Sequence, residues 1–441
     1  MAHITQGFCD VRNRVVTGLV SAIMLIASVV SPAYSQTDSR ELVILTTFSR
    51  EPLNALIAHF NQLYPDVEVR LIHRRTQSAI QLLNRRYMQD VDLVLSSSPF
   101  LMQKLASHSR LKPISWRAER PSWIEPFILP PKEQVAVLGY SGAGIVWSQD
   151  YLDANTLPVP KSFASLTDPI YFEHITMSTP SRSGTTQMMI ESILHQYGWR
   201  DGWRMILNIG ANLGTISARS FGVSDYVAKG QFGVGPTIDS YALILQQEFE
   251  HLHFSYDQDF TLMPTYIAEI AGQGYDQYAA KFIQLLLSQQ VQNTLDQSSF
   301  SKHSLADKSL YTDQIPNLVF ADVLGREQLT NKIFDMAVTK RLPMLKDSWL
   351  ALHTVEKQLT NAEQLAELET LKAQLFSVPF SEQEIESLAN KLTMLNTQSE
   401  LEKNQMEVLL AEFDHYLALE LAASLVEVED KLRQLKLEAN L

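Results

Sequence analysis

From residue 41 onward, short runs of branched apolar residues alternate with longer stretches of helical periodicity, and this alternation limits the folds open to the chain. Residues 42–46, 67–72 and 91–95 have the composition of buried strands. Residues 52–64 and 79–88 instead place their apolar side chains on one helical face. Strands that alternate with helices at this spacing form a parallel sheet covered by helices, so the sequence predicts an α/β fold.

A second α/β unit follows the first. Residues 135–146 predict a long strand that several glycines interrupt, which suits a chain crossing between two lobes. Further strands and helices are expected at 175–178, 185–197 (ending at Gly198), 201–209 (ending at Gly210), 221–229 and 232–238. We therefore predict a two-lobed protein.

The lobe boundaries follow from these elements. We expect the first lobe to comprise residues 36–138 and 245–350, and the second lobe residues 139–244. Closure would occur about the strands that cross near residues 140–146 and 239–244.

The C-terminal residues 351–441 differ in composition from the rest. They contain 7 Lys or Arg against 17 Asp or Glu, no glycine and one proline, Pro379. Apolar residues recur at helical spacing throughout, and Ser381 with Glu384 forms a capping box preceded by Phe380. We predict an acidic α-helical extension, folded as a small antiparallel bundle.

Residues 1–35 have the features of a secretory leader. Arg12 and Arg14 precede an apolar run over residues 15–30, and the small residues Ala33 and Ser35 stand at the −3 and −1 positions of a cleavage site. The run is short for a span of about 20 residues. We expect cleavage after Ser35 and export to the periplasm, with an uncleaved membrane anchor as the alternative.

The segment 178–186 carries the strongest sign of ligand chemistry, because six of its nine residues bear hydroxyl groups and a predicted helix follows directly. A helix N-terminus offers unpaired N–H donors and a partial positive charge to an anion. Gly184 permits close approach, and Arg182 offers a fork to a phosphate or carboxylate. The alternative is an ordinary helix cap. The candidate ligands of the anion here are Ser181, Arg182, Ser183, Gly184, Thr185 and Thr186.

Further polar residues follow other predicted strands, where open α/β sheets place their ligands. Each taken alone is typical of a solvated turn, but together they would line one cleft with hydroxyl groups and guanidinium groups. Asp239 would accept hydrogen bonds from ligand hydroxyls, or else cap the next helix. These candidates are Thr47, Arg75, Thr76, Ser97, Arg219, Ser220 and Asp239.

Other functions find little support in the sequence. A net charge of −13 argues against a nucleic-acid binder, which needs a basic face. No nucleophile elbow, phosphate-binding P-loop or zinc-protease motif is present, so no catalytic residue, cofactor or metal is expected. Trp199, Trp203 and Phe221 are interpreted as packing residues rather than as a stacking platform for a ligand.

Residues 41–345 resemble periplasmic solute-binding proteins of the two-lobed, type II kind, a group that includes ferric-iron and sugar-phosphate binders of ABC importers. The resemblance is carried by the segments 178–186, 198–203, 227–230 and 233–241. It implies an anion-binding role for Ser183, Gly184 and Thr185, and more loosely for the strand-end residues. Ferric binders carry adjacent tyrosines where this chain has Asp239-Ser240-Tyr241, so iron binding is not expected.

The resemblance implies a phosphorylated small-molecule ligand, such as a phosphoglycerate-like acid, and a partner in the inner membrane. That partner is either a sensor kinase, with the chain acting as a regulator of transport, or an ABC permease, with the chain delivering a phosphosugar or another anion. The acidic extension favours the sensor kinase, because it offers a docking surface. A secreted phosphoester hydrolase is the alternative from a different functional class.

Overall fold

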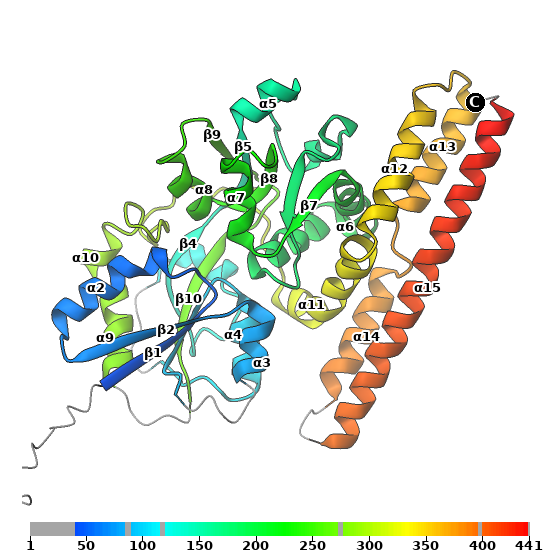
Figure 1. Cartoon of the computed structure of the whole chain (residues 1–441). Helices are drawn as coiled ribbons and strands as arrows, with labels where there is room; N and C mark the ends of the chain where they lie inside the picture. The colour runs from blue at the N-terminus through cyan, green and yellow to red at the C-terminus, as the bar shows by residue number, and fades with distance from the viewer. Residues whose placement is uncertain (1–39, 84–89, 115–119, 272–276, 396–398, 440–441) are drawn as a thin grey trace, which may run out of the picture.

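The computed structural model describes residues 40–83, 90–114, 120–271, 277–395 and 399–439. The predicted leader and its cleavage site after Ser35, and the end of the helix expected at 79–88, lie outside these residues. Two α/β lobes stand side by side, and a layer of long helices runs along the second lobe (Figure 1). The predicted architecture, two lobes with a C-terminal helical extension, is confirmed.

The first lobe is built on a five-stranded sheet of order β2-β1-β3-β10-β4, in which only β10 runs against the others. Alternate residues of β1 are buried on opposite faces of the sheet: Leu42 and Ile44 pack beneath α2 and α9, whereas Val43 and Leu45 pack beneath α3 and α4. Burial on both faces explains the uninterrupted apolar run. The elements are β1 Arg40–Thr46, β2 Val67–His73, β3 Leu93–Ser96, β4 Ala136–Ser141, β10 Met263–Glu269, α2 Asn54–Leu63, α3 Thr76–Leu83, α4 Pro99–Ser107, α9 Gln277–Leu286 and α10 Gln289–Gln292.

The second lobe repeats this plan with a sheet of order β7-β6-β8-β5-β9. Here β5 runs antiparallel to both β8 and β9. The elements are β5 Ala143–Ser148, β6 Ile175–Ser178, β7 Leu213–Ser217, β8 Val234–Ile238, β9 Leu252–Tyr256, α5 Gln149–Asn155, α6 Gly184–Asn212, α7 Ser220–Ala228 and α8 Asp239–Gln246. Short 3₁₀ turns cover Glu51–Leu53, Ser122–Phe127, Ala164–Thr167 and Pro169–Tyr171.

The two helices expected before and after Gly198 are joined in α6. Gly198 has φ +75°, so the helix breaks there as predicted, but it resumes at once. Gly210 does not end a helix; it lies inside α6, and a Cβ on it would stand 3.0 Å from the Val338 side chain. Gly210 is therefore a site of close helix packing.

The predicted lobe boundaries differ from the sheet assignments. The strand expected at 135–146 is two strands, β4 in the first sheet and β5 in the second, so the first crossing lies at Gly142. Residues 239–244 are helical, and β9 still belongs to the second sheet, so the return crossing lies at residues 257–262. Strand β9 lies at the edge of its sheet and has polar side chains among its apolar ones. It therefore lacks the continuous apolar run by which a buried strand is predicted from the sequence.

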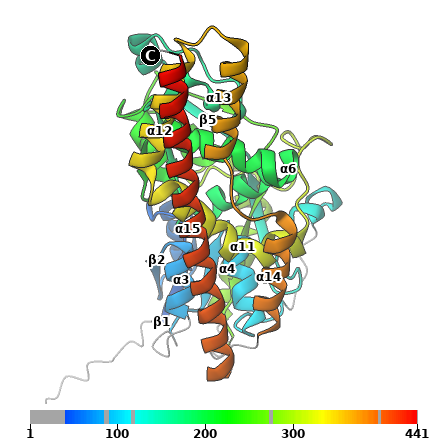
Figure 2. The same ribbon diagram turned by 90° about the vertical axis from the view of Figure 1, so that its right-hand side faces the viewer.

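The C-terminal helices form one core with the second lobe. One cluster of buried apolar residues runs from Ile190 and Trp203 of α6 through α11 and α12 to Leu417 of α15. In Figures 1 and 2, α13 and α14 follow one another along α15, which returns in the opposite direction. The bounds are α11 Phe320–Phe334, a π-helical turn Asp335–Thr339, α12 Leu342–Glu356, α13 Ala362–Leu375, α14 Glu382–Met394 and α15 Glu400–Glu438.

The capping box at the start of α14 forms as predicted. Ser381 Oγ accepts a bond from the Glu384 N–H, and Glu384 Oε2 accepts one from the Ser381 N–H. Phe380 stacks on Phe413 of α15, with ring centroids 4.8 Å apart. Among the described residues, no helix combines the length and the apolarity needed to cross a bilayer.

Candidate ligand-binding site

Four helices from the two lobes begin at one cavity between them. The first lobe contributes the starts of α3 at Thr76 and of α4, which Ser98 caps. The second lobe contributes the starts of α6, which Ser183 caps, and of α7 at Ser220. Each helix start carries unpaired N–H groups and about half a positive charge. The cavity is partly open to solvent and is lined by Thr47, Phe48, His73, Arg75, Thr76, Ser97, Ser98, Arg182, Ser183, Gly184, Thr185, Arg219, Ser220, Phe221 and Tyr241.

The charge of this lining is positive. Arg75 comes from the first lobe, and Arg182 and Arg219 come from the second. No aspartate or glutamate stands among the described lining residues, although the chain as a whole carries a net charge of −13. The cavity is therefore suited to an anion.

His73 also faces this positive charge. Burial lowers the pKa of the His73 imidazole, and the charges of Arg219 and Arg74 lower it further. His73 is therefore neutral at neutral pH. An anion bound in the cavity would raise the pKa of this imidazole and so favour its protonation.

The start of α6 is ordered by its own hydroxyl groups. Ser183 Oγ accepts a bond from the Thr186 N–H at 3.1 Å and lies 2.8 Å from Thr185 Oγ1. Thr186 Oγ1 is 2.5 Å from Ser178 Oγ, at the end of β6. Ser183 and Thr185 thus line the cavity, whereas Thr186 ties the helix to the sheet behind it.

Strand ends of the first lobe hold the opposite wall. Thr47 Oγ1 lies 2.7 Å from Ser96 Oγ, and Ser97 Oγ lies 3.1 Å from Thr265 Oγ1 on β10. These bonds fix the two loops that follow β1 and β3. The predicted residues brought together around the cavity are Thr47, Arg75, Thr76, Ser97, Arg182, Ser183, Gly184, Thr185, Arg219 and Ser220.

Three predicted residues stand apart from the cavity lining. Ser181 pairs with Thr179, 2.9 Å away, and Thr186 faces β6. Asp239 is fully buried, and its carboxylate accepts bonds from the Gly142 N–H at 2.7 Å and the Ser240 N–H at 2.5 Å. Asp239 therefore does not line the cavity, unlike the position expected for it, because its carboxylate is turned to the backbone at the first lobe crossing.

Asp239 instead joins the lobes through His303, whose Nε2 lies 3.1 Å from Asp239 Oδ2. His303 pairs by its backbone with Tyr140 of the first sheet. Burial by itself would lower the pKa of His303, but bonding to Asp239 and Asp307 outweighs burial and raises it. The Asp239–His303 contact is therefore a polar interaction between the two lobes, next to the point where the chain crosses between them.

Sequence reasoning missed several members of this region. Lys302 is almost completely buried, and its Nζ donates to Ser141 Oγ at 2.8 Å and Ser240 Oγ at 2.9 Å. Burial lowers its pKa to about 8. Its ammonium lies 5.1 Å from the ring centroid of Phe48, a cavity residue, so it adds positive charge behind the wall. No periodicity predicted this burial, because 300–303 lies in an irregular loop.

Besides Phe48, the aromatic residues Phe221 and Tyr241 line the cavity. Phe221, interpreted from the sequence as a packing residue, lies 5.4 Å from the Arg219 guanidinium and 6.1 Å from the Tyr241 ring. Trp199 and Trp203 are buried, as expected. Burial raises the pKa of Tyr241 to about 12, so this phenol is neutral.

The fold and the cleft define a class of protein. Residues 89–322 match the family described as bacterial extracellular solute-binding protein, and the chain belongs to this family. Membership implies a periplasmic location. The chain is 36% identical over 354 residues to the phosphoglycerate transport regulatory protein PgtC of Salmonella typhimurium, a match that covers 78% of this chain and 87% of the relative. PgtC of Salmonella typhi matches to the same extent.

Solved structures show the same two-lobed, type II architecture. The periplasmic binding protein AfuA from Actinobacillus pleuropneumoniae, solved with fructose-6-phosphate, aligns with a TM-score of 0.55 at 16% identity, over 67% of this chain and 98% of AfuA. Iron-bound HitA from Pseudomonas aeruginosa aligns with a TM-score of 0.53 at 15% identity, over 66% and 98%. At these identities the similarity concerns the fold.

Proposed function

We propose that this solute-binding protein binds a phosphorylated small acid of the phosphoglycerate class between its lobes and regulates the uptake of that acid through a membrane sensor kinase. The observation that carries the ligand class is the convergence of four helix starts and three arginines on a cavity whose described lining has no carboxylate. Such a site stabilises a ligand with several negative charges.

The residues suggest how binding would favour the closed form. Arg182, Ser183 and Thr185 belong to the second lobe, whereas Arg75 and Thr76 belong to the first. A phosphate held by one set and a carboxylate held by the other would contact both lobes only when they are closed. A ligand shifts a conformational equilibrium by its differential affinity for the two states, so binding would shift this chain towards closure.

The choice of phosphoglycerate rests on the relative at 36% identity, which is named for phosphoglycerate transport regulation. The regulatory role rests on the same name. The alternative is a component of an ABC importer that delivers a phosphosugar or another anion, and the same cavity chemistry would serve that role. A phosphoester hydrolase is the third candidate.

The deciding experiment is a binding screen by thermal shift followed by calorimetry. The chain is tested with 2-phosphoglycerate, 3-phosphoglycerate, phosphoenolpyruvate, hexose phosphates and ferric citrate. We expect tight binding of a phosphoglycerate. Preferential binding of a hexose phosphate would favour the importer alternative, and binding of ferric citrate alone would contradict the proposed ligand class. Release of inorganic phosphate from a bound ester would instead support the hydrolase.

The regulatory part needs a cellular test. In a strain that lacks the chain, induction of the phosphoglycerate transporter by external ligand should be lost and should return with the wild-type chain. Deletion of residues 351–441 is unsuitable for this test, because it would uncover the buried faces of α6 and α11. The site variant Arg182→Ala separates the roles: loss of induction while a constitutively expressed transporter still takes up ligand supports regulation.

Export through a leader cleaved after Ser35 is part of the same proposal. Sequencing the N-terminus of the chain recovered from the periplasmic fraction should give Gln36. An N-terminus at residue 1 on a membrane-bound chain would indicate the anchor alternative.

A further inference from the structure

Helix α15 carries two apolar faces, and the described part of the chain covers one of them. The inner face packs against the other C-terminal helices and the second lobe through buried residues that include Phe413, Leu417 and Val428. A second set is between 55% and 72% exposed: Leu401, Val408, Leu419, Val426 and Leu437. A helix that is apolar on both sides generally has a second packing partner.

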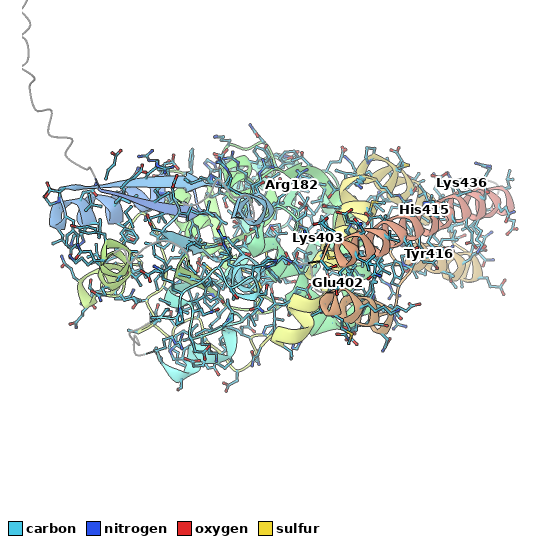
Figure 3. The ribbon with its side chains drawn as sticks, turned by 90° about the horizontal axis from the view of Figure 1, so that it is seen from below. Arg182, Glu402, Lys403, His415, Tyr416 and Lys436 are labelled. Atoms are coloured by element: carbon cyan, nitrogen blue, oxygen red, sulfur yellow. The ribbon has the colours of Figure 1, made fainter. Side chains whose placement is uncertain are left out.

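The exposed residues form one straight line. They recur at spacings of 7, 11, 7 and 11 residues, and at about 100° per residue these spacings return to nearly the same side of the helix. Figure 2 shows α15 running across the face of the molecule that is turned to the viewer, with no described element in front of it. His415 lies between Lys403 and Lys436 along the same helix (Figure 3). An exposed apolar stripe of this length marks an interaction surface.

Four of the five stripe residues are placed symmetrically about the point between Ala422 and Ala423; Leu401 has no mirror partner. Leu419 and Val426 are equally distant from that point, and so are Val408 and Leu437. A helix with this property presents the same surface to an antiparallel copy of itself, in which each residue meets its mirror position. Such self-complementarity defines the interface of a two-fold dimer.

Two pairs of exposed polar residues on this face obey the same symmetry. Glu412 mirrors the basic residue Arg433, and all of the described side chains at these positions are exposed. The second mirrored polar pair is His415 with Asp430. Opposite charges at mirror positions attract in an antiparallel pair, whereas a parallel pair would place Glu412 against a second Glu412. The charge pattern therefore favours a second copy in the antiparallel direction.

The centre of the stripe allows close approach. Ala422 and Ala423 floor a shallow groove that Leu419, Val426, Glu427 and Asp430 border. The distance between packed helices depends on the side chains at their contact, and small residues permit a short one. The two leucines and two valines nearest the symmetry point would then interlock across these alanines.

We propose that two copies of this chain associate through α15, packed antiparallel about a two-fold axis at Ala422 and Ala423. The surface lies outside the ligand cavity and shares no residue with it, so the proposal is independent of which ligand binds.

Cysteine crosslinking tests the register. The test uses the full chain with Cys9→Ser, so that no native thiol remains, and introduces Val408→Cys together with Leu437→Cys. These positions are 29 residues apart, or about 43 Å along one helix, so they cannot pair within a chain. We expect a disulfide-linked dimer on a non-reducing gel from the double variant and none from Val408→Cys alone. A crosslink from Val408→Cys alone would reveal a parallel pair and overturn the proposal.

Sedimentation velocity tests the association itself. We expect the wild-type chain to sediment as a dimer at micromolar concentration, and Leu419→Glu with Val426→Glu to sediment as a monomer. Ile170→Glu, at an exposed position of the second lobe, is the matched control and should remain a dimer. Circular dichroism checks that each variant is folded. If the wild-type chain still sediments as a monomer at about 100 µM, the proposal is overturned.

Charge reversal gives a third, independent result. Glu412→Arg and Arg433→Glu should each weaken the dimer at least tenfold, because each places like charges at both mirror contacts. Mixing the two variants should restore association, since one chain then presents two arginines to two glutamates of the other. Failure of the mixture to associate better than either variant would contradict the antiparallel pairing.

Discussion

Gly184 and Ser98 meet across the cleft so closely that a Cβ on Gly184 would lie 2.6 Å from the Ser98 Cβ. Gly184 begins α6 in the second lobe, and Ser98 caps α4 in the first. This contact brings two helix N-termini, both partly positive, towards each other. An anion between them would relieve that repulsion, so the contact links closure to the charge of the ligand.

Gly184→Ala should therefore weaken binding. The added methyl group would collide with Ser98 and hold the lobes apart, and we expect the affinity for 3-phosphoglycerate to fall at least tenfold, or about 1.4 kcal/mol. Calorimetry measures the change. Gly325→Ala is the control, because its Cβ would find its nearest neighbour at 4.0 Å, and it should bind as the wild type does. Equal affinities for the two variants would refute the role of this contact.

Arg182→Ala should remove one of the three guanidinium groups at the cavity. We expect at least a tenfold loss of affinity and a weaker dependence of binding on salt, because fewer charges are then paired with the anion. Calorimetry at two ionic strengths measures both effects. Arg200→Ala removes a charge from α6, the helix that follows Arg182, at a side chain that is 81% exposed and outside the cavity lining, and it should change neither.

Ligand binding should take up a proton at His73. Burial, followed by the charges of Arg219 and Arg74, lowers the pKa of this imidazole in the free protein; Arg75 acts in the same direction and Glu51 opposes it. An anion in the cavity would raise that pKa, so His73 should make binding stronger as the pH falls from neutral to mildly acidic values. The measurement compares the affinities of wild type and His73→Gln between about pH 8 and pH 5.5.

The difference between these two proteins isolates the imidazole from the ionisation of the phosphate itself. A wild-type advantage that grows towards low pH supports the prediction. Parallel pH profiles for the two proteins would contradict it.

Arg326→Leu should destabilise the joint between the second lobe and the C-terminal helices. Arg326 lies 2.9 Å from Glu191 in α6 and 2.6 Å from Glu382 at the start of α14. Glu191 is fully buried, so removal of Arg326 would leave a buried carboxylate without its partner. We expect the free energy of unfolding to fall by about 3–5 kcal/mol, measured by urea denaturation.

A second variant identifies the cause of that loss. Glu191→Gln combined with Arg326→Leu removes the buried charge together with its partner, so this protein should be more stable than Arg326→Leu alone. If the double variant is no more stable, lost packing rather than the unpaired charge explains the effect.

The sequence was most informative where chemistry is local. The hydroxyl-rich segment before α6 predicted a helix start because capping depends on residues within one turn, and Ser183 occupies the cap. The same holds for Ser381 and Glu384. Lobe boundaries were less accurate, because β9 belongs to the second sheet through pairing with a strand about a hundred residues earlier.

Some of the candidate site residues lie where the sequence predicted, and others do not. Thr47, Arg75 and Ser220 follow strands or precede helices, and the ends of such elements gather at one edge of each sheet. Asp239 stands in an equivalent position along the chain, yet the backbone N–H of Gly142 occupies its carboxylate. A pattern of residues does not reveal which distant group is already satisfying a polar atom.

By itself the sequence determined the alternation of strands and helices, the starts of α6 and α14 and the helical character of the C-terminal residues, since each depends on neighbours along the chain. Tertiary structure alone decided that Lys302 is buried behind Phe48, that Phe221 faces the cavity and that no other described residues cover the outer face of α15. The physical reason is that burial and pairing are properties of the space around a residue, and that space is filled by segments far away in the sequence.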